Sequence, residues 1–131
     1  MATTPAFAAT PVVAAVATGT TASTTPFGTP SAPATVYTAP ASGARIDEID
    51  IVGLGTTSNN LIVIYVYNGT TYWPIKVIQT TAVTASATVA PFTTSVTFSN
   101  LVLTNASYSI RVSLFAADTS GYMVTALGGS F

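Results

Sequence analysis

Charged side chains are scarce in this sequence. Three of its 131 residues are basic and four are acidic, so the net charge is -1, whereas about a quarter of the residues in an ordinary domain are charged. Contacts with phosphate backbones or anionic lipids need clustered Lys and Arg, so we expect no nucleic acid and no membrane among the partners. A net charge this close to zero favours association between protein molecules.

Histidine and cysteine are absent altogether. Without His the chain lacks the commonest general base and the commonest metal ligand, and without Cys it has neither thiol nucleophiles nor disulfides. The remaining nucleophiles are hydroxyl groups and Lys76, and no triad of the usual kind can be built from them. We therefore expect a protein that is not an enzyme and that has no catalytic residue, metal site or cofactor.

Long apolar runs are missing as well. The longest is LIVIYVY at residues 61–67, which is far shorter than the ~20 residues of a membrane-spanning helix. The apolar stretch AFAATPVVAAVA near the N-terminus has no basic residue before it and is interrupted by Pro11. We therefore do not expect a secretion signal there.

The first 42 residues differ in composition from the rest of the chain. They contain six of the eight prolines, are rich in Thr, Ala and Ser, and carry no charge. Proline removes backbone donors, and short side chains bury too little apolar area to offset the entropy of ordering. We expect residues 1–42 to form an extended arm that is ordered by a partner, and residues 43–131 to form the folded domain. The expected anchors of the arm are Phe7, Val12, Val13 and Phe27.

From residue 43 onward, β-branched and aromatic runs alternate with turn residues. In SYSIRVSLF (residues 107–115) apolar and polar positions alternate, as in a strand with one buried face. In LIVIYVYNGTTYWPIKVI (residues 61–78) the Asn68-Gly69 pair predicts a hairpin with a type I′ turn. Because Pro74 cannot donate to a β-ladder, the second hairpin strand should lie at a sheet edge or carry a bulge. Further strands are expected at residues 36–39, 45–52, 95–103 and 122–127.

These segments predict an all-β protein: an antiparallel β-sandwich, jelly-roll or immunoglobulin-like, with an extended N-terminal arm. Periodicity does not distinguish the two connectivities. Both faces of the strand at residues 61–67 are apolar, whereas a sandwich strand with one face in water needs only one apolar face. The second face must be covered by the arm or by another subunit. We favour another subunit, because a small folded part gains stability from oligomerisation.

The acidic cluster RIDEID at residues 45–50 is the first candidate for chemistry. Paired carboxylates can act on glycosides or bind calcium, but Asp47 and Glu48 are adjacent and should point to opposite faces of a strand. A hydrolase that uses this cluster remains an alternative. The simpler interpretation is a solvated strand start that Arg45 neutralises. Asp118, in AADTSG, is interpreted as a turn residue.

Aromatic residues gather around the expected hairpin: Tyr65, Tyr67, Tyr72 and Trp73. Aromatic platforms on β-sandwiches stack on sugar rings or anchor protein interfaces, whereas aromatic side chains in strands commonly pack in the core. A carbohydrate-binding or adhesive module that uses them is therefore an alternative function. The chain ends in ALGGSF, and Phe131 is expected to dock onto its own sheet or onto a neighbouring subunit.

Several segments between residues 43 and 131 resemble a family of small β-sandwich proteins encoded among the virion genes of tailed bacteriophages. The likeness lies in GARIDEIDIVGLGTT, LIVIYVYNGTTYWPIKVI, TASATVAPF, LVLTNASYSIRVSL and the closing ALGGSF. It implies a non-enzymatic decoration or cement protein that binds the major capsid protein on the outer surface of the phage head, with the tail as the alternative location. Contacts repeated over a symmetric shell gain by multivalency, so we expect self-association as a homotrimer.

Overall fold

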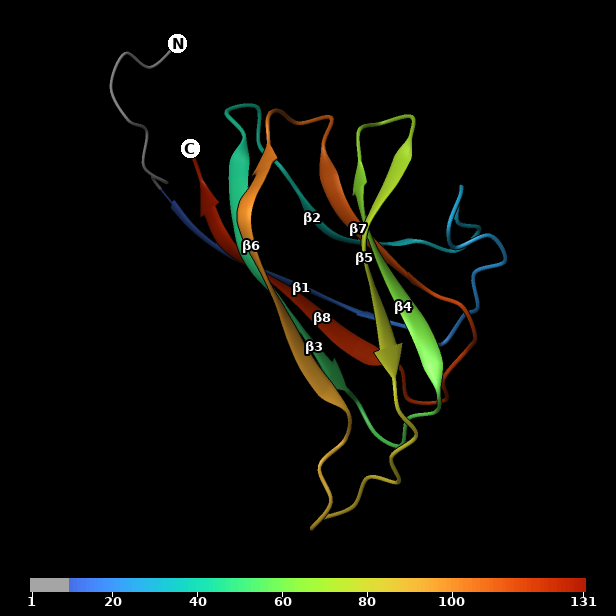
Figure 1. Cartoon of the computed structure of the whole chain (residues 1–131). Coiled ribbons are helices and arrows are strands. Elements are labelled where there is room, and N and C mark those ends of the chain that lie inside the picture. Colours follow the sequence, from blue (N-terminus) through green and yellow to red (C-terminus); the bar gives the residue numbers. More distant parts are fainter. Residues whose placement is uncertain (1–9) are drawn as a thin grey trace.

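The computed structural model describes residues 10–131 as two packed antiparallel sheets (Figure 1). Within this range there are eight strands and no helix, so no helix is long and apolar enough to cross a membrane. The predicted all-β antiparallel sandwich is confirmed. Sheet A consists of β1 (Thr10–Thr18), β3 (Ala44–Gly53), β6 (Thr93–Leu103) and β8 (Tyr122–Ser130), and sheet B of β2 (Ala34–Thr38), β4 (Asn60–Tyr67), β5 (Tyr72–Thr80) and β7 (Ser109–Leu114).

The strands pair like one long hairpin that is rolled up on itself. β1 pairs with β8, β2 with β7, β3 with β6 and β4 with β5, all antiparallel. Additional pairing of β3 with β8 and of β4 with β7 completes the sheet orders β1-β8-β3-β6 and β2-β7-β4-β5. Eight strands connected in this way form a jelly roll. Of the two connectivities that the sequence left open, the chain therefore adopts the jelly roll.

The core between the sheets is built from branched aliphatic side chains. Ile46, Ile49 and Ile51 of β3 and Ile62 and Ile64 of β4 are fully buried. β-branched side chains of this kind pack well on a pleated surface. Ile46 and Ile49 both face the core although they are three residues apart, because the register of β3 shifts between them, as at a β-bulge.

Residues 10–42 do not form an arm separate from the domain. β1 pairs with β8 along its whole length, and β2 pairs with β7, so the boundary expected after residue 42 is wrong for the described residues. The reason is visible in β1, where Val12 and Val16 face inward while Val13 and Ala15 lie exposed. Small apolar residues on both faces hide this alternation in the sequence.

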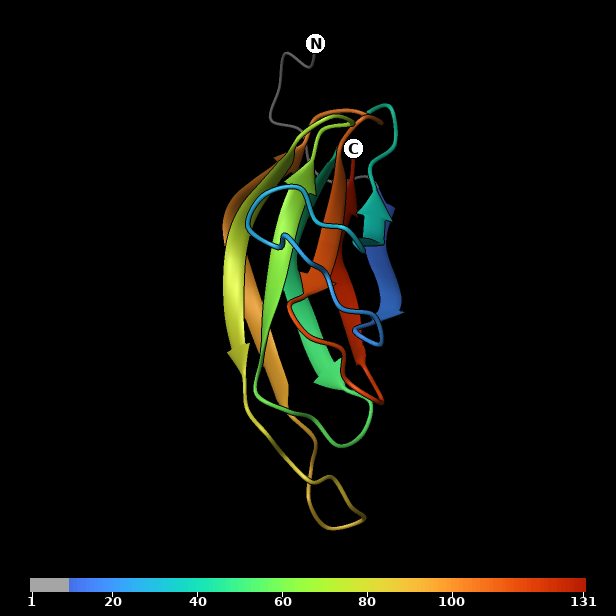
Figure 2. The same cartoon turned by 90° about the vertical axis from the view of Figure 1, so that its right-hand side faces the viewer.

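The segment between β1 and β2, residues 19–33, crosses the outer face of sheet B (Figure 2). The backbone amide of Ser23 donates a 2.8 Å hydrogen bond to the carbonyl of Leu114, and the Tyr65 hydroxyl donates to the carbonyl of Pro26. Tyr65 is fully buried although it faces away from the core. The second apolar face of β4 is thus covered here by the same chain, and not by the second subunit that we favoured.

The hairpin of β4 and β5 forms where the sequence predicts it, but with a different turn. Tyr67 pairs with Tyr72, so that four residues connect the strands. Gly69 has a positive φ of 98°, whereas no non-glycine residue of the described chain does, and a type I′ turn would need a positive φ at both central residues. Instead, the Asn68 Oδ1 accepts hydrogen bonds from the amides of Thr70 and Thr71, as in an Asx turn.

Pro74 lies in an edge strand, next to an irregularity in its pairing. β5 is one of the two edge strands of sheet B, and its register with β4 shifts next to Pro74. Both predicted features, the edge and the irregularity, are therefore present. A proline at this position removes one backbone donor from the edge.

Candidate interaction surface

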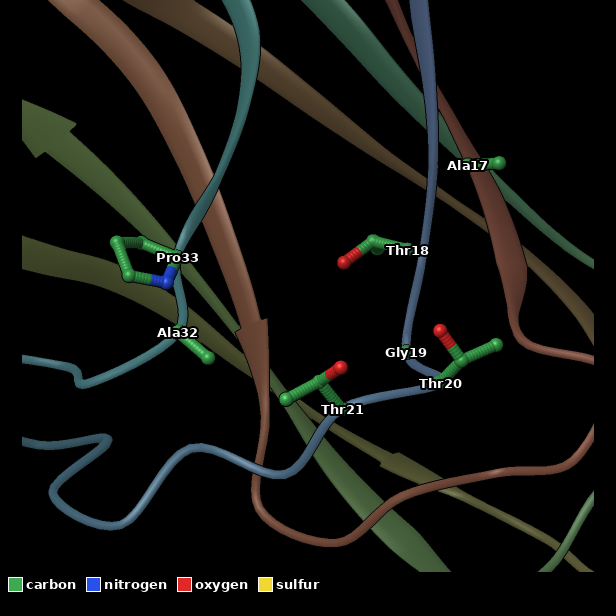
Figure 3. A pocket seen from close by; sticks show the side chains of 7 residues that line it. All are labelled: Ala17, Thr18, Gly19, Thr20, Thr21, Ala32 and Pro33. Carbon is green, nitrogen blue, oxygen red and sulfur yellow. The ribbon is translucent and has the colours of Figure 1, made fainter.

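Groups that could perform chemistry are not assembled in the part of the chain that the structure describes. No set of Asp and Glu side chains among residues 10–131 could hold a metal ion. A hollow lies between the end of β1 and the start of β2 (Figure 3). It offers hydroxyl groups but no charged or aromatic side chain, and so little with which to bind or activate a substrate. It is lined by Ala17, Thr18, Gly19, Thr20, Thr21, Ala32 and Pro33.

The acidic cluster on β3 is a solvated strand surface. The Nε of Arg45 lies 2.8 Å from the Oδ1 of Asp47, and both side chains are well exposed, so the predicted local neutralisation is confirmed. Asp47 and Glu48 both lie on the side away from the core, because the register shifts between Ile46 and Glu48. The expectation that they point to opposite faces is therefore wrong, and the bulge is the reason.

Asp118 is more than a turn residue. It is buried in the loop between β7 and β8, and its Oδ1 accepts hydrogen bonds from the Ser58 amide at 3.1 Å and the Ser58 hydroxyl at 2.7 Å. The Asn60 Nδ2 donates to the carbonyl of Ala116 in the same loop at 2.7 Å. These bonds join two chain segments at one end of the sandwich. The arrangement therefore stabilises the loops at this end.

The tyrosines of the predicted platform contact one another instead of presenting a free face. The rings of Tyr67 and Tyr72 stack with centroids 4.2 Å apart, and Tyr65 meets Tyr72 edge-on at 5.6 Å. The guanidinium of Arg111 lies 4.6 Å from the centroid of the Tyr67 ring, a cation–π contact. Burial raises the pKa of Tyr65. Three of the four aromatic residues are thus occupied by contacts within the chain.

Trp73 is separated from these tyrosines. It pairs with the core residue Val66, whereas Tyr72 pairs with Tyr67, so successive side chains of β5 lie on opposite faces of sheet B. Trp73 is 45% exposed, and its ring lies 6.4 Å from that of Tyr108. The structure therefore does not combine Trp73 with the tyrosines into one stacking surface.

The other predicted interface residues fall into different environments. Val12 is buried in β1, whereas Val13 is 76% exposed and Phe27, in the segment over sheet B, is 56% exposed. Phe131 docks onto its own chain: its amide donates to the carbonyl of Gly43, and its carbonyl accepts from the Ser42 hydroxyl. Phe7 lies outside the described residues.

The two sides of the sandwich differ in how closely their edge strands approach each other. On the closed side the edge strands β1 and β2 contact each other, and β2 also contacts β8, whereas β5 and β6 on the other side make no comparable contact. Between residues 73 and 102 lie five of the ten large apolar side chains that are exposed in the described chain. They are Trp73, Ile75, Val77, Val89 and Val102. We call the surface formed by β5 and β6 the open side.

The open side is grooved and almost uncharged, and it mixes apolar side chains with hydroxyl groups. One hollow is lined by Ile75 of β5 and residues 97–101 of β6, and the next by residues 76–78 and 94–97. Lys76 is the single charged residue between residues 72 and 103. Exposed apolar side chains on a surface with almost no charge are typical of sites of protein association. The sequence signal was the lack of charge over this long stretch, but sequence alone did not show that its strands become neighbouring sheet edges.

No protein-family model matches this chain, and no curated protein sequence matches it.

Proposed function

We propose that this chain is a non-enzymatic structural component of a tailed-phage virion, which decorates and stabilises the outside of the capsid. Three features support the proposal: the likeness of its strand segments to virion proteins, a compact β-body without assembled chemical groups in the described residues, and the open side. The jelly roll is also the fold of many viral capsid domains. A fold does not imply a function by itself, so the fold adds analogy and not proof.

The open side is the observation that carries the proposal. Interface cores are depleted in charged residues and enriched in large apolar ones, and the stretch from residue 72 to residue 103 shows both properties. We therefore assign assembly with virion proteins, including the major capsid protein, to this side. It takes the role that the sequence suggested for the arm, because β1 and β2 are built into the sheets.

A carbohydrate-binding module is less well supported. Jelly rolls also occur as lectin domains, so the fold does not separate the two functions. The aromatic residues separate them better, because Tyr65 is buried and Tyr67 and Tyr72 stack on each other. A single accessible Trp73 does not make the platform that the alternative required.

Copy number in purified virions tests the proposal. Quantitative mass spectrometry should find this chain in a simple ratio to the major capsid protein, as expected for a symmetric shell component. A few copies per particle would instead place it in the tail or in a fibre. Absence from the particle would overturn the proposal.

Variants then test the open side. Ile75→Asp and Val77→Asp place a carboxylate on the exposed edge of β5 and should lower the occupancy of the protein on capsids in a rebinding assay. Val13→Asp is the matched control, because Val13 is even more exposed but lies on β1, at the closed side. Equal losses for all three variants, or no loss for any, would contradict the assignment of assembly to the open side.

A further inference from the structure

We infer that the open side is completed by a second copy of this chain, through antiparallel pairing of β6 with β6 about a two-fold axis. Pairing would extend sheet A across both copies as one continuous sheet. The inference rests on the proposed role of the open side in assembly, and it names the occupant.

The four edge strands differ in how well they are protected against pairing. β2 has five residues and a shifted register, and β1 contains Pro11 and lies against β2. β5 carries Pro74 and Lys76. β6 has eleven residues, TTSVTFSNLVL, with neither proline nor charge. Prolines, charges and short lengths are the means by which edges avoid pairing, so β6 is the edge best suited to receive another strand.

The pattern of exposure along β6 selects one register of self-pairing. Its core-facing residues include Val96, Phe98, Leu101 and Leu103, whereas 97, 99, 100 and 102 are exposed. An antiparallel pair whose two-fold axis lies between residues 99 and 100 places Val96 opposite Leu103 and Phe98 opposite Leu101. Every core-facing residue from 96 to 103 then meets a core-facing residue of the second copy. The irregular spacing of the core-facing residues in one β6 therefore fits the same spacing in the other.

The charges on the neighbouring strand are compatible with the same register. Within one copy, Glu48 of β3 pairs with Thr97 of β6, and Arg45 pairs with Val102. This register places Thr97 opposite Val102 of the second copy. Across the four strands, Glu48 of one copy is therefore in line with Arg45 of the second copy. The two charges are about three strand spacings, or ~14 Å, apart. At this distance their attraction is largely screened by salt, and Arg45 is already paired with Asp47, so the charges do not oppose the register; β6 itself brings no like charges together.

This second copy also explains the half-buried apolar residues at the edge of the core. Phe98 and Leu101 pack against the core and also line the hollow beside Ile75. A strand alongside β6 would pair the free backbone groups of that edge and cover these side chains. β6 of a second copy supplies such a strand.

Sedimentation of the purified full chain tests the inference. We expect a dimer at micromolar concentration, and we expect Ser99→Lys to weaken dimerisation by about tenfold or more, because the axis brings the two new ammonium groups side by side. Ala15→Lys is the control, since Ala15 is exposed on β1 at the opposite edge of the same sheet. A monomer, the trimer expected from the sequence, or a dimer that Ser99→Lys does not weaken would overturn the inference.

Cross-linking tests the register directly, because the chain has no natural cysteine. The double variant Thr97→Cys/Val102→Cys should form a covalent dimer on oxidation. The two positions in one strand are about 17 Å apart, too far for a disulfide within one copy. Each single variant is the control and should remain uncross-linked, because Thr97 faces Val102 of the second copy and not Thr97 of that copy. Equal cross-linking in the single variants would overturn the register.

The outcomes separate this inference from the proposed function. A monomeric protein found at high copy number in virions would overturn the β6 pair and leave the structural role intact. A cross-linked dimer of a protein absent from virions would support the pair and overturn the virion role.

Discussion

The hydroxyl of Tyr65, in the middle of β4, donates a hydrogen bond to the backbone carbonyl of Pro26. The same hydroxyl lies 2.7 Å from the Oγ of Ser113 on β7. Tyr65 therefore ties the segment at residues 19–33 to the centre of sheet B. This contact fixes a stretch of Thr, Ser, Ala and Pro that has few apolar anchors of its own.

Tyr65→Phe should loosen this segment and destabilise the fold. The substitution leaves the carbonyl of Pro26 without its donor, and such a loss costs about 1–3 kcal/mol of the free energy of unfolding. Urea unfolding measures the change, and hydrogen exchange at the Ser23 amide should become faster. In the control Tyr67→Phe, the lost bond is the exposed one to the carbonyl of Gly69, so a loss equal to that of Tyr65→Phe would contradict the role given to Tyr65.

Tyr122→Phe should have the opposite outcome. The Tyr122 hydroxyl is fully buried and has no hydrogen-bond partner in the described part of the chain, so its removal relieves a desolvation cost. We expect the free energy of unfolding to stay within about 0.5 kcal/mol or to rise. A loss comparable to that of Tyr65→Phe would mean that the hydroxyl is paired.

Stability should fall as the pH rises above 10. Burial raises the pKa of both Tyr65 and Tyr122 above the ordinary value of 10.0. Between that value and the raised one, the unfolded chain loses the proton while the folded chain keeps it, so rising pH favours unfolding. Chemical unfolding at pH 9 to 11 measures this dependence, and Tyr122→Phe should make the fall shallower. An unchanged slope in that variant would contradict the contribution of Tyr122.

Gly128→Ala should be among the most damaging single changes. A Cβ at Gly128 would lie 1.9 Å from the carbonyl oxygen of Arg45, where β8 passes the bulge of β3. Because the obstacle is backbone, we expect a loss of about 3 kcal/mol, seen as a lower melting temperature. Gly28→Ala is the matched control, since nothing lies within 4 Å of its Cβ position. A fully stable Gly128→Ala protein would contradict the close strand approach.

Asp118→Ala should destabilise the end of the sandwich where Ser58 and Asn60 lie. It removes the buried acceptor of the Ser58 amide and hydroxyl. Because Ser58 itself is exposed and water replaces part of these bonds, we expect a loss of about 1–2 kcal/mol. The control Asp47→Ala breaks an ion pair that is well exposed, so its effect should stay below about 1 kcal/mol. Thermal unfolding compares the two, and the reverse ranking would contradict the structural role of Asp118.

The candidate surface was predictable in part. The composition of the aromatic hairpin indicated a binding surface, yet the rings of Tyr67 and Tyr72 stack on each other. The apolar residues Ile75 and Val77 carry no motif, and they matter because β5 ends up at an edge. Composition identified residues that can make contacts, whereas their availability depends on which neighbours the fold supplies.

The sequence by itself determined that the chain forms an all-β sandwich with few groups for chemistry. Period-two alternation at residues 107–115, the hairpin signal at Asn68-Gly69 and the absence of His and Cys are local or compositional facts, and they predict strands, turns and excluded reactions. The tertiary structure decided the jelly-roll order, the place of Thr10–Thr18 in sheet A and the open side between β5 and β6. These depend on pairing between strands far apart in the chain, such as β1 with β8, which the periodicity of a single strand does not encode.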